Sequence, residues 1–306
     1  MMGTSGRHST LLPPPHGLVA GVGRELRATG LLLADNAIAA ALPGLLFTMA
    51  ACAHVGITGW SLVPPLATST VLFAFYNYVS DAANQAVGVV EDMVNKPHRP
   101  VPRGLFTPRG LLVRFWCAMA LYTLLGCLTG TLLWVLLWQV SVVVLNLLAR
   151  PRDYLWVKPL CMLSGTVAQL AGAWQLAAPL EDVAWSWILV PAVGFILPLA
   201  FEDVRDMGGD AQLGRRTFAL LVGHWPVRVW FALIVAALPL PVYTFMLAPS
   251  PTDGPVVAAC TVVITALMWT AVARSLLLRD VRADRVTYRL YTLTYAATIA
   301  CGPVLL

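Results

Sequence analysis

The segment NQAVGVVEDMVNKPHRP, residues 84–100, directly follows an apolar stretch, residues 63–83, that is long enough to cross a membrane as a helix. It places three amides, two acids and a run of cations at and after the expected end of that helix. Polar side chains are costly at such a position unless they bind something. The segment therefore predicts a membrane bundle with a polar binding site at its edge.

The composition of the whole chain supports a membrane-embedded fold. Of its 306 residues, 58% are hydrophobic and only 11% are charged, with a mean hydropathy of +0.75, whereas a soluble domain carries about 25% charged residues. We expect an all-α polytopic membrane protein whose nine transmembrane helices surround a central cavity that opens near the cytoplasmic edge. The apolar stretches are 36–58, 63–83, 110–129, 131–149, 159–178, 184–201, 226–247, 255–277 and 287–306.

Residues 31–306 are expected to form one transmembrane domain. Residues 1–30 are predicted to be a disordered or poorly ordered tail, because the chain starts with a polar, proline-rich run, MMGTSGRHSTLLPPPHG, that has no apolar core. The six cysteines lie inside apolar stretches without metal-like spacing, so they indicate helix packing and no disulfide framework.

The distribution of charge predicts the orientation in the membrane. With nine spans, the lysines and arginines fall in the N-terminal segment and alternate loops, or just inside the adjoining helix ends, whereas the other side carries only Glu181, Asp182 and Asp253. The positive-inside rule places the cation-rich side, the N-terminus and the polar motifs in the cytoplasm and the C-terminus on the opposite side. The net charge of +5 is therefore no nucleic-acid signal.

Two of the predicted helix ends on the cytoplasmic side carry acids. In the first, Asn84, Gly88 and Asp92 follow i, i+4, i+8 and would share one helix face, with Asp81 and Glu91 near that stripe. Cations follow at Lys96, Arg99 and Arg103. An amide, acids and cations on one helix end predict one half of a binding site.

The second acidic helix end is FEDVRDMGGDAQLGRRT, residues 201–217, in which Asp203, Asp206 and Asp210 follow i, i+3, i+7. Clustered carboxylates repel one another unless a cation lies between them, and oxygen ligands without His or Cys suit Mg²⁺. The adjacent arginines and lysines suit phosphate oxygens. The two halves together predict a Mg²⁺–diphosphate site beside an apolar cavity, which fits a polyprenyl diphosphate. A proton or cation transporter would also use intramembrane acids. These acids, however, cluster at one membrane edge and not at the mid-plane, which argues against a transport relay.

Three segments resemble the UbiA superfamily of intramembrane prenyltransferases. NKPHRPVPRG (95–104) and DVRDMGGDAQLGRRT (203–217) are similar to the runs in and after the two aspartate-rich motifs of that family, and RPRDYLWVKP (150–159) is similar, more loosely, to a loop with a Tyr and a Lys that touches the diphosphate. The resemblance implies nine transmembrane helices, bound Mg²⁺ and a prenyl diphosphate substrate.

The first motif departs from the usual Asn-Asp-x-x-Asp-x-x-x-Asp, because Gln85 and Gly88 replace the first two acids. The pattern NQxxGxxEDxxNKPxRP is similar to the UbiA-type terpene cyclases, which implies a class I cyclase that ionises a C15 to C25 prenyl diphosphate, C20 being favoured, and cyclises it with release of pyrophosphate. The alternative is a UbiA-type prenyltransferase that attaches the chain to an aromatic or other acceptor. One interpretation of Gly88 is that it gives room to a differently placed chain or diphosphate.

The resemblance and the spacing assign roles to individual residues. The expected metal ligands are Asn84, Asp92, Asp203, Asp206 and Asp210, of which Asp92, Asp206 and Asp210 are also expected to be catalytic. Further ligands or ligand-orienting groups are Asp81, Gln85 and Glu91. The expected diphosphate-binding residues are Lys96, Arg99, Arg152, Tyr154, Lys158, Arg215 and Arg216. The expected partners are the prenyl diphosphate and membrane lipid, with no nucleic acid and no obligatory protein partner.

Other polar and aromatic residues keep more than one interpretation. Asp35 and Asn36 are most simply the N-cap of the first span, and Asp153, Asp280 and Asp284 are expected to be plain loop charges. His98 is equally consistent with a ligand contact and with a bystander. Candidates for cation–π stabilisation of a carbocation are Tyr76, Trp174, Tyr291 and Tyr295.

Overall fold

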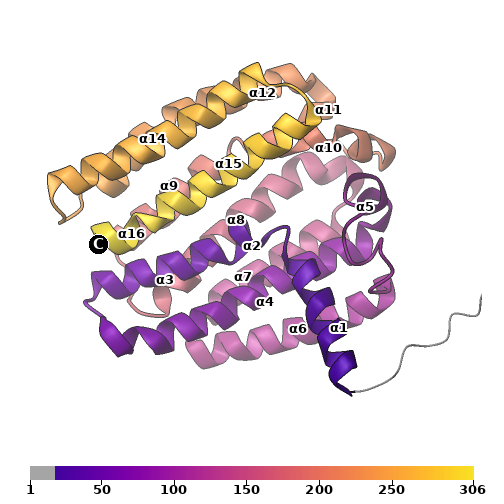
Figure 1. Cartoon of the computed structure of the whole chain (residues 1–306), viewed down its shortest axis with the longest axis horizontal. Coiled ribbons are helices and arrows are strands. Elements are labelled where there is room, and N and C mark those ends of the chain that lie inside the picture. The colour runs from indigo at the N-terminus through magenta and orange to yellow at the C-terminus, as the bar shows by residue number, and fades with distance from the viewer. Residues whose placement is uncertain (1–17) are drawn as a thin grey trace, which may run out of the picture.

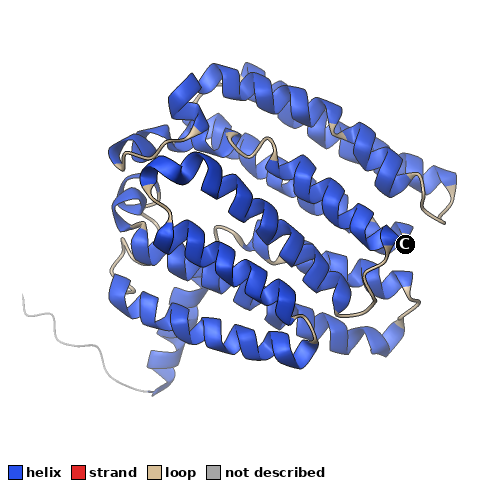
Figure 2. Cartoon of the chain, turned by 180° about the vertical axis from the view of Figure 1, so that it is seen from behind, coloured by secondary structure: helices blue, strands red, loops and turns tan. Residues whose placement is uncertain are grey.

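The computed structural model describes residues 18–306, and all regular structure in that part of the chain is helical (Figures 1 and 2). The first half contains α1 (Leu18–Leu33), α2 (Ala37–Ala40), α3 (Leu42–His54), η1 (Gly59–Leu62), α4 (Val63–Val87), α5 (Val89–Asn95), α6 (Pro108–Thr129), α7 (Leu132–Val143) and η2 (Val144–Leu148). The second half contains η3 (Pro151–Asp153), α8 (Tyr154–Gln175), α9 (Asp182–Ile196), α10 (Phe201–Gln212), α11 (Phe218–Val222), α12 (His224–Ala237), α13 (Pro239–Val242), η4 (Tyr243–Leu247), α14 (Gly254–Leu277), α15 (Val281–Ala300) and α16 (Gly302–Leu305).

The apolar stretches of the sequence form the long helices of the bundle. Five helical segments among residues 18–306 are long and apolar enough to cross a membrane, and the bent pair of α9 and α10 would be a sixth. The five are Ala37–His54, Gly59–Val87, Pro108–Thr129, His224–Leu247 and Gly254–Leu277. All nine predicted stretches are largely helical, but a count of nine membrane spans stays a prediction.

The N-terminal region differs from the expectation. Residues 18–33 form helix α1, so the predicted tail of residues 1–30 is helical from residue 18 onward, and its first 17 residues lie outside the described part. Helix α1 packs against α4 and lies across the direction of the long helices (Figure 1). Glu25 on α1 pairs with Arg114 on α6, which ties this helix to the bundle.

The two acid-bearing helices lie at the same end of the bundle. Figure 1 shows α5 and α10 at one end of the long helices and the C-terminus at the other end. Helix α4 ends at Val87 and α5 begins at Val89, while the α9–α10 pair bends by 48° between Ile196 and Phe201. Both polar motifs therefore follow a helix break, and α5 packs directly against α10.

A close approach of the two motif helices explains one glycine. A Cβ added at Gly209 of α10 would overlap Nδ2 of Asn95, the last residue of α5. A side chain at residue 209 would force the Asn95 side chain out of this position. The second motif therefore uses Gly209 to dock against the first.

Candidate active site

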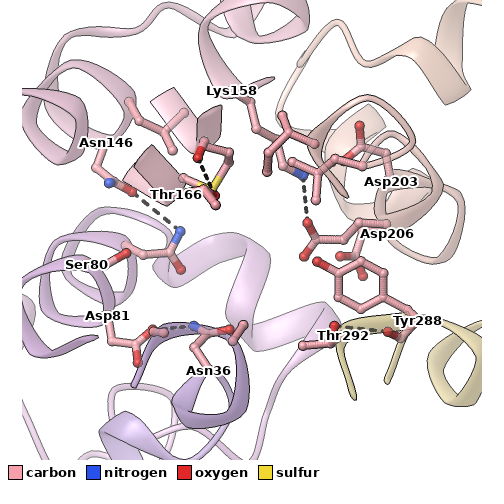
Figure 3. Close-up of a pocket in the computed structure, with 18 of the residues that line it drawn as sticks. Asn36, Ser80, Asp81, Asn146, Lys158, Thr166, Asp203, Asp206, Tyr288 and Thr292 are labelled. Atoms are coloured by element: carbon pink, nitrogen blue, oxygen red, sulfur yellow. Dashed lines mark hydrogen bonds and ion pairs between the residues drawn. The ribbon is translucent and has the colours of Figure 1, made fainter. Parts of the chain in front are cut away.

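A cavity of about 240 Å³ lies between α2, α4, η2, α8, α9, α10 and α15. Its walls differ in character from one end to the other. Acids and cations of the two motifs line the end near α5 and α10, whereas Tyr76, Trp138, Phe195, Tyr291 and Tyr295 line the other end. Figure 3 shows Lys158, Asp203 and Asp206 on one side of this cavity, with Asn36 and Asp81 on another. The cavity therefore offers a charged end and an aromatic end to a single ligand.

Arg99 organises the first motif. Its Nη1 donates to both carboxylate oxygens of Asp92 at 3.0 and 3.2 Å and to Oδ1 of Asn84 at 3.0 Å, while its Nε donates to Asp35 at 2.9 Å. The side chain of Arg99 is only 3% exposed. Burial alone would lower the pKa of Arg99, but the carboxylates of Asp92 and Asp35 outweigh it and raise that pKa. The guanidinium is therefore a permanent positive charge beside the cavity.

Asp35 is not a helix cap, in contrast to the interpretation from the sequence. Asn36, which precedes α2, makes no side-chain capping bond. Asp35 instead accepts from Arg99 and lies 3.1 Å from Nε2 of His98. Burial works to raise the pKa of Asp35, but the hydrogen bonds of Arg99 and His98 lower it on balance. Asp35 thus belongs to the charge network of the first motif, and His98 touches that network on its exposed side.

Helix α10 supplies the second motif with its carboxylates already paired. Nζ of Lys158 lies 2.6 Å from Asp203 and 3.2 Å from Glu202. The guanidinium of Arg205 lies 2.9 Å from Glu202 and 3.4 Å from Asp206. Asp203, Asp206 and Asp210 all line the cavity, so the predicted i, i+3, i+7 face of this helix is the face that the cavity wall shows.

Arg215 joins the two motifs across the cavity mouth. Its Nη1 lies 2.5 Å from Glu91 of α5 and 3.1 Å from Asp210 of α10. The guanidinium stacks over the ring of Tyr154 at 4.6 Å, and Nζ of Lys158 lies 5.7 Å from the same ring. Burial lowers the pKa of Arg215, but Tyr154 and its two carboxylate partners raise it further than burial lowers it. The two acidic helix ends therefore converge on one charged rim.

The structure places most of the predicted site residues on the cavity wall. Those on the wall are Asp81, Asn84, Glu91, Lys96, Arg99, Tyr154, Lys158, Asp203, Asp206, Asp210 and Arg215. Four others are absent from the wall. Asp92 is buried against Arg99, and Nε2 of Gln85 donates to the carbonyl of Leu32 at 3.3 Å. Arg152 and Arg216 are exposed on the surface.

The helix break at Gly88 explains why Asp92 is not on the cavity wall. A continuous helix would keep Asn84, Gly88 and Asp92 on one face, but the chain breaks at Gly88 and a separate helix begins at Val89. Gly88 does not line the cavity, so the interpretation that it makes room there for a chain or diphosphate gains no support. A Cβ at this position would lie 2.8 Å from the carbonyl oxygen of Asn84, so a side chain at Gly88 would disturb the break.

The donor set has the chemistry that Mg²⁺ prefers, although no metal cluster is formed within residues 18–306. No three His, Cys, Asp or Glu side chains in that part of the chain group closely enough to hold a metal. The acids of both motifs contact arginine or lysine instead. Oxygen donors from Asn84 and the three aspartates of α10 nevertheless face one cavity, and hard oxygen ligands beside phosphate-binding cations fit Mg²⁺.

At the aromatic end of the cavity, the tyrosine hydroxyls and the indole N–H of Trp138 are hydrogen-bonded to the surrounding protein. Tyr76 and Trp138 stack with centroids 4.3 Å apart, and Trp138 donates to the carbonyl of Tyr76 at 2.9 Å. The hydroxyls of Tyr76, Tyr291 and Tyr295 donate to Gly165, Phe195 and Gln169, respectively. The fourth aromatic candidate, Trp174, is not on the wall and donates to the carbonyl of Pro179.

Several polar residues of the site had no assignment from the sequence. Glu202 and Arg205 lie inside the second motif and could have been found by the same helical spacing. Asn146 lies in the π-helical turn η2, a feature that often marks a functional site, and accepts a hydrogen bond from Asn84 at 3.5 Å.

Away from the cavity, the structure corrects one further prediction. Asp284, expected to be a plain loop charge, is buried and pairs with Arg228 at 2.6 Å, which joins α15 to α12.

The comparisons with known proteins agree with this architecture. The pattern of the UbiA prenyltransferase family matches residues 41–295. The chain belongs to the UbiA prenyltransferase family. It is 34% identical over 284 residues to the somaliensene A/B synthase of Streptomyces somaliensis, covering 91% of this chain and 94% of that protein. It is 32% identical over 236 residues to the diterpene cyclase eriG of Hericium erinaceus, covering 74% and 71%.

A solved UbiA homologue shares the fold. The structure of the Archaeoglobus fulgidus homologue bound to GPP and Mg²⁺ aligns with a TM-score of 0.61 at 14% identity, covering 89% of this chain and 98% of that one. At this identity the likeness concerns the fold alone. As a UbiA-family chain with several helices long and apolar enough to cross a membrane, the protein is a multi-pass integral membrane protein.

Proposed function

We propose that this UbiA-family protein is a membrane-embedded class I terpene cyclase. The observation that carries the proposal is the single cavity whose rim holds oxygen donors and cations and whose interior holds aromatic faces. That arrangement matches a prenyl diphosphate, which has an anionic head and an apolar chain. Two relatives named as a terpene synthase and a diterpene cyclase support the same activity. The reaction class is a carbon–oxygen lyase acting on a C15 to C25 diphosphate, with C20 favoured.

The charged end would bind the diphosphate. Arg99, Lys158 and Arg215 are positioned at the cavity rim to donate charge-assisted hydrogen bonds to phosphate oxygens. Asn84 and the α10 aspartates, Asp203, Asp206 and Asp210, are the residues that would hold Mg²⁺, which when bound supplies electrostatic stabilisation to the departing pyrophosphate. The proposed ligand role of Asp92 rests on the sequence pattern, and in the structure its carboxylate fixes the orientation of Arg99.

The aromatic end would hold the carbocation formed when the carbon–oxygen bond breaks. The rings of Tyr76, Trp138, Phe195, Tyr291 and Tyr295 line this end. Each face turned toward a positive charge contributes roughly 0.5–2 kcal/mol of stabilisation. The hydroxyls of the three tyrosines and the indole N–H of Trp138 donate to acceptors in the surrounding protein, which holds these rings in place along the wall. Rings fixed in this way can stabilise the cation while a double bond of the same chain attacks it.

The proposal is tested by incubating the purified protein in lipid with C15, C20 and C25 diphosphates and Mg²⁺, without any acceptor. We expect stoichiometric pyrophosphate and a cyclic terpene, identified by mass spectrometry. Asp206→Asn serves as the inactive control, since Asp206 lines the cavity within the second motif. Turnover that begins only after a phenol or quinone precursor is added would show a prenyltransferase and refute the cyclase.

The proposed placement in the membrane follows from the charge pattern. The motif end of the bundle faces the cytoplasm, together with the N-terminus, and the C-terminus lies on the opposite side. The opposite ends occupied by α5 and by the C-terminus support this arrangement (Figure 1). A protease-protection or cysteine-labelling experiment with a probe attached after Leu306 tests it.

A further inference from the structure

Asp81 differs from the other acids of the cavity wall. Glu91, Glu202, Asp203, Asp206 and Asp210 each pair with an arginine or lysine. Asp81 has no ion-pair partner among the residues that the structure describes, although it is 99% buried, with a relative exposure of 1%. A buried carboxylate without a positive partner is costly. A carboxylate in such a place is stabilised when a positive charge or a proton arrives.

The two carboxylate oxygens of Asp81 are not equivalent. Oδ1 accepts a hydrogen bond from Nδ2 of Asn36, whereas Oδ2 is buried and has no hydrogen-bond partner within the described chain. Both residues line the cavity, and Figure 3 shows them on a different side of it from Lys158 and Asp203. Asn77, one helical turn away on α4, is also buried and leaves its own Oδ1 without a donor. Two buried acceptor oxygens on this part of α4, Oδ2 of Asp81 and Oδ1 of Asn77, therefore lack a donor within the described chain.

Asp81 lies between the two ends of the cavity. Along α4, Asn84 of the charged end is three residues away, about 4.5 Å of helix rise, and Tyr76 of the aromatic end is five residues away in the other direction, about 7.5 Å. A diphosphate would be repelled by an unpaired carboxylate. A carbocation in the aromatic end is attracted to it, so the position suits the hydrocarbon part of the substrate near its head.

The neighbouring amides hold Asn36 in place rather than compete for the carboxylate. Nδ2 of Asn77 donates to the carbonyl of Leu33 at 3.2 Å, and Nε2 of Gln85 donates to the carbonyl of Leu32 at 3.3 Å. These two bonds fix the junction of α1 and α2, where Asn36 lies. Asn36 is therefore the positioning residue for Asp81, and it leaves Oδ2 free.

We propose that Asp81 is the base that ends the cyclisation, an inference that rests on the proposed cyclase function. Oδ2 takes a proton from the carbon adjacent to the final cationic centre. The electrons of that C–H bond become the new C=C bond, which neutralises the cation and yields a terpene hydrocarbon. The proton then passes to the pyrophosphate formed by ionisation and leaves with it, so the carboxylate is restored. The reaction needs no further reactant.

The test compares Asp81→Asn with the wild type and with Asp153→Asn, a matched change at a half-exposed loop acid. Pyrophosphate release and terpene products are measured in the same acceptor-free incubation with the C20 diphosphate and Mg²⁺. The Asp81 carboxylate is hydrogen-bonded to Asn36 and to none of the expected metal ligands, so Asp81→Asn should keep pyrophosphate release well above that of Asp206→Asn. The fraction of the wild-type hydrocarbon should fall at least about 100-fold, the low end of the loss expected for a missing general base. Alcohols or other double-bond isomers should replace it.

Three results would overturn the assignment. An unchanged product profile would show that another group, such as the pyrophosphate, is the base. Loss of pyrophosphate release as severe as in Asp206→Asn would place Asp81 in the head-group site. A wild-type product that is exclusively an alcohol would show that water ends the reaction. If Asp81→Asn does not fold, Asn36→Ala replaces it and must alter the isomer ratio while keeping pyrophosphate release; an unaltered ratio refutes the proposal.

The same experiment separates this inference from the function on which it rests. Wild-type protein that makes product only with an added acceptor refutes the cyclase and the base together. Wild-type protein that cyclises the chain, combined with an Asp81→Asn variant of identical product ratio, leaves the cyclase standing and refutes the role of Asp81 alone.

Discussion

Replacing Arg99 by glutamine should destabilise the protein strongly, because Arg99 is the buried centre of the first motif. Its side chain is 3% exposed and that of Asp92 is 2% exposed. Removing one partner of a buried ion pair leaves the other charge unpaired and costs about 3–5 kcal/mol. The bond to Asp35 adds less, because that carboxylate is 28% exposed and water screens it. We expect a loss of about 3–5 kcal/mol in the free energy of unfolding.

The surface pair of Arg152 and Asp153 is the matched control. Its charged atoms are 3.7 Å apart, and the side chains are 64% and 50% exposed. Exposed pairs of this kind contribute about 0–1 kcal/mol. Arg152→Gln should therefore leave the free energy of unfolding nearly unchanged, and it also tests the prediction that Arg152 binds diphosphate, since its surface position favours normal pyrophosphate release.

Equilibrium unfolding of the purified variants in mixed micelles, followed by far-UV circular dichroism, measures these losses. A double-mutant cycle with Asp92→Asn then isolates the pair. The double variant should lose at least about 1 kcal/mol less than the two single losses added together, because neither charge is left behind alone. Additive losses, or an Arg99→Gln loss as small as that of Arg152→Gln, would show that Arg99 does not hold the motif together.

Three further changes test the rest of the site. Removing divalent metal with a chelator should lower pyrophosphate release at least about 100-fold, the scale of one lost electrostatic contact in a transition state, and Mg²⁺ should restore it; activity that survives chelation would contradict the predicted oxygen-ligand site. Trp138→Leu should extend the aromatic end, raising the C25 to C20 ratio of kcat/KM at least about tenfold; an unchanged ratio would show that the stacked pair with Tyr76 does not limit chain length. Gly88→Ala should cost about 1–3 kcal/mol of stability, because its Cβ would lie 2.8 Å from the Asn84 carbonyl; a thermal midpoint equal to that of the wild type would show that the break tolerates a side chain.

The large features of the fold could be predicted because they depend on length, hydropathy and charge side. Apolar stretches of about 20 residues can satisfy their backbone groups in a membrane only as helices. The alternation of loops then placed the two acidic ends on one side, and the structure has α5 and α10 in contact. Asp203, Asp206 and Asp210 share a cavity wall because α10 stays helical over all of them.

The first motif was harder to predict because its helix does not continue. The spacing of Asn84, Gly88 and Asp92 indicates a shared face only for an unbroken helix, and the break at Gly88 turns Asp92 toward Arg99. Side-chain pairing across the fold is also invisible to local spacing. In sequence Asp35 looks like a helix cap and Asp284 like a loop charge, yet their partners, Arg99 and Arg228, lie 64 and 56 residues away.

The pairing of the motif acids with cations has a consequence for how the site binds its ligands. Asp203 and Asp210 contact Lys158 and Arg215, which are also the groups best placed to donate to a diphosphate. We expect a bound diphosphate to draw these cations away from the carboxylates and to leave the carboxylates as unpaired oxygen donors. A divalent cation could then bind these carboxylates without displacing lysine and arginine from them. Because such coupling is reciprocal, we expect each ligand to raise the affinity of the site for the other, so that metal and diphosphate bind together more tightly than either binds alone.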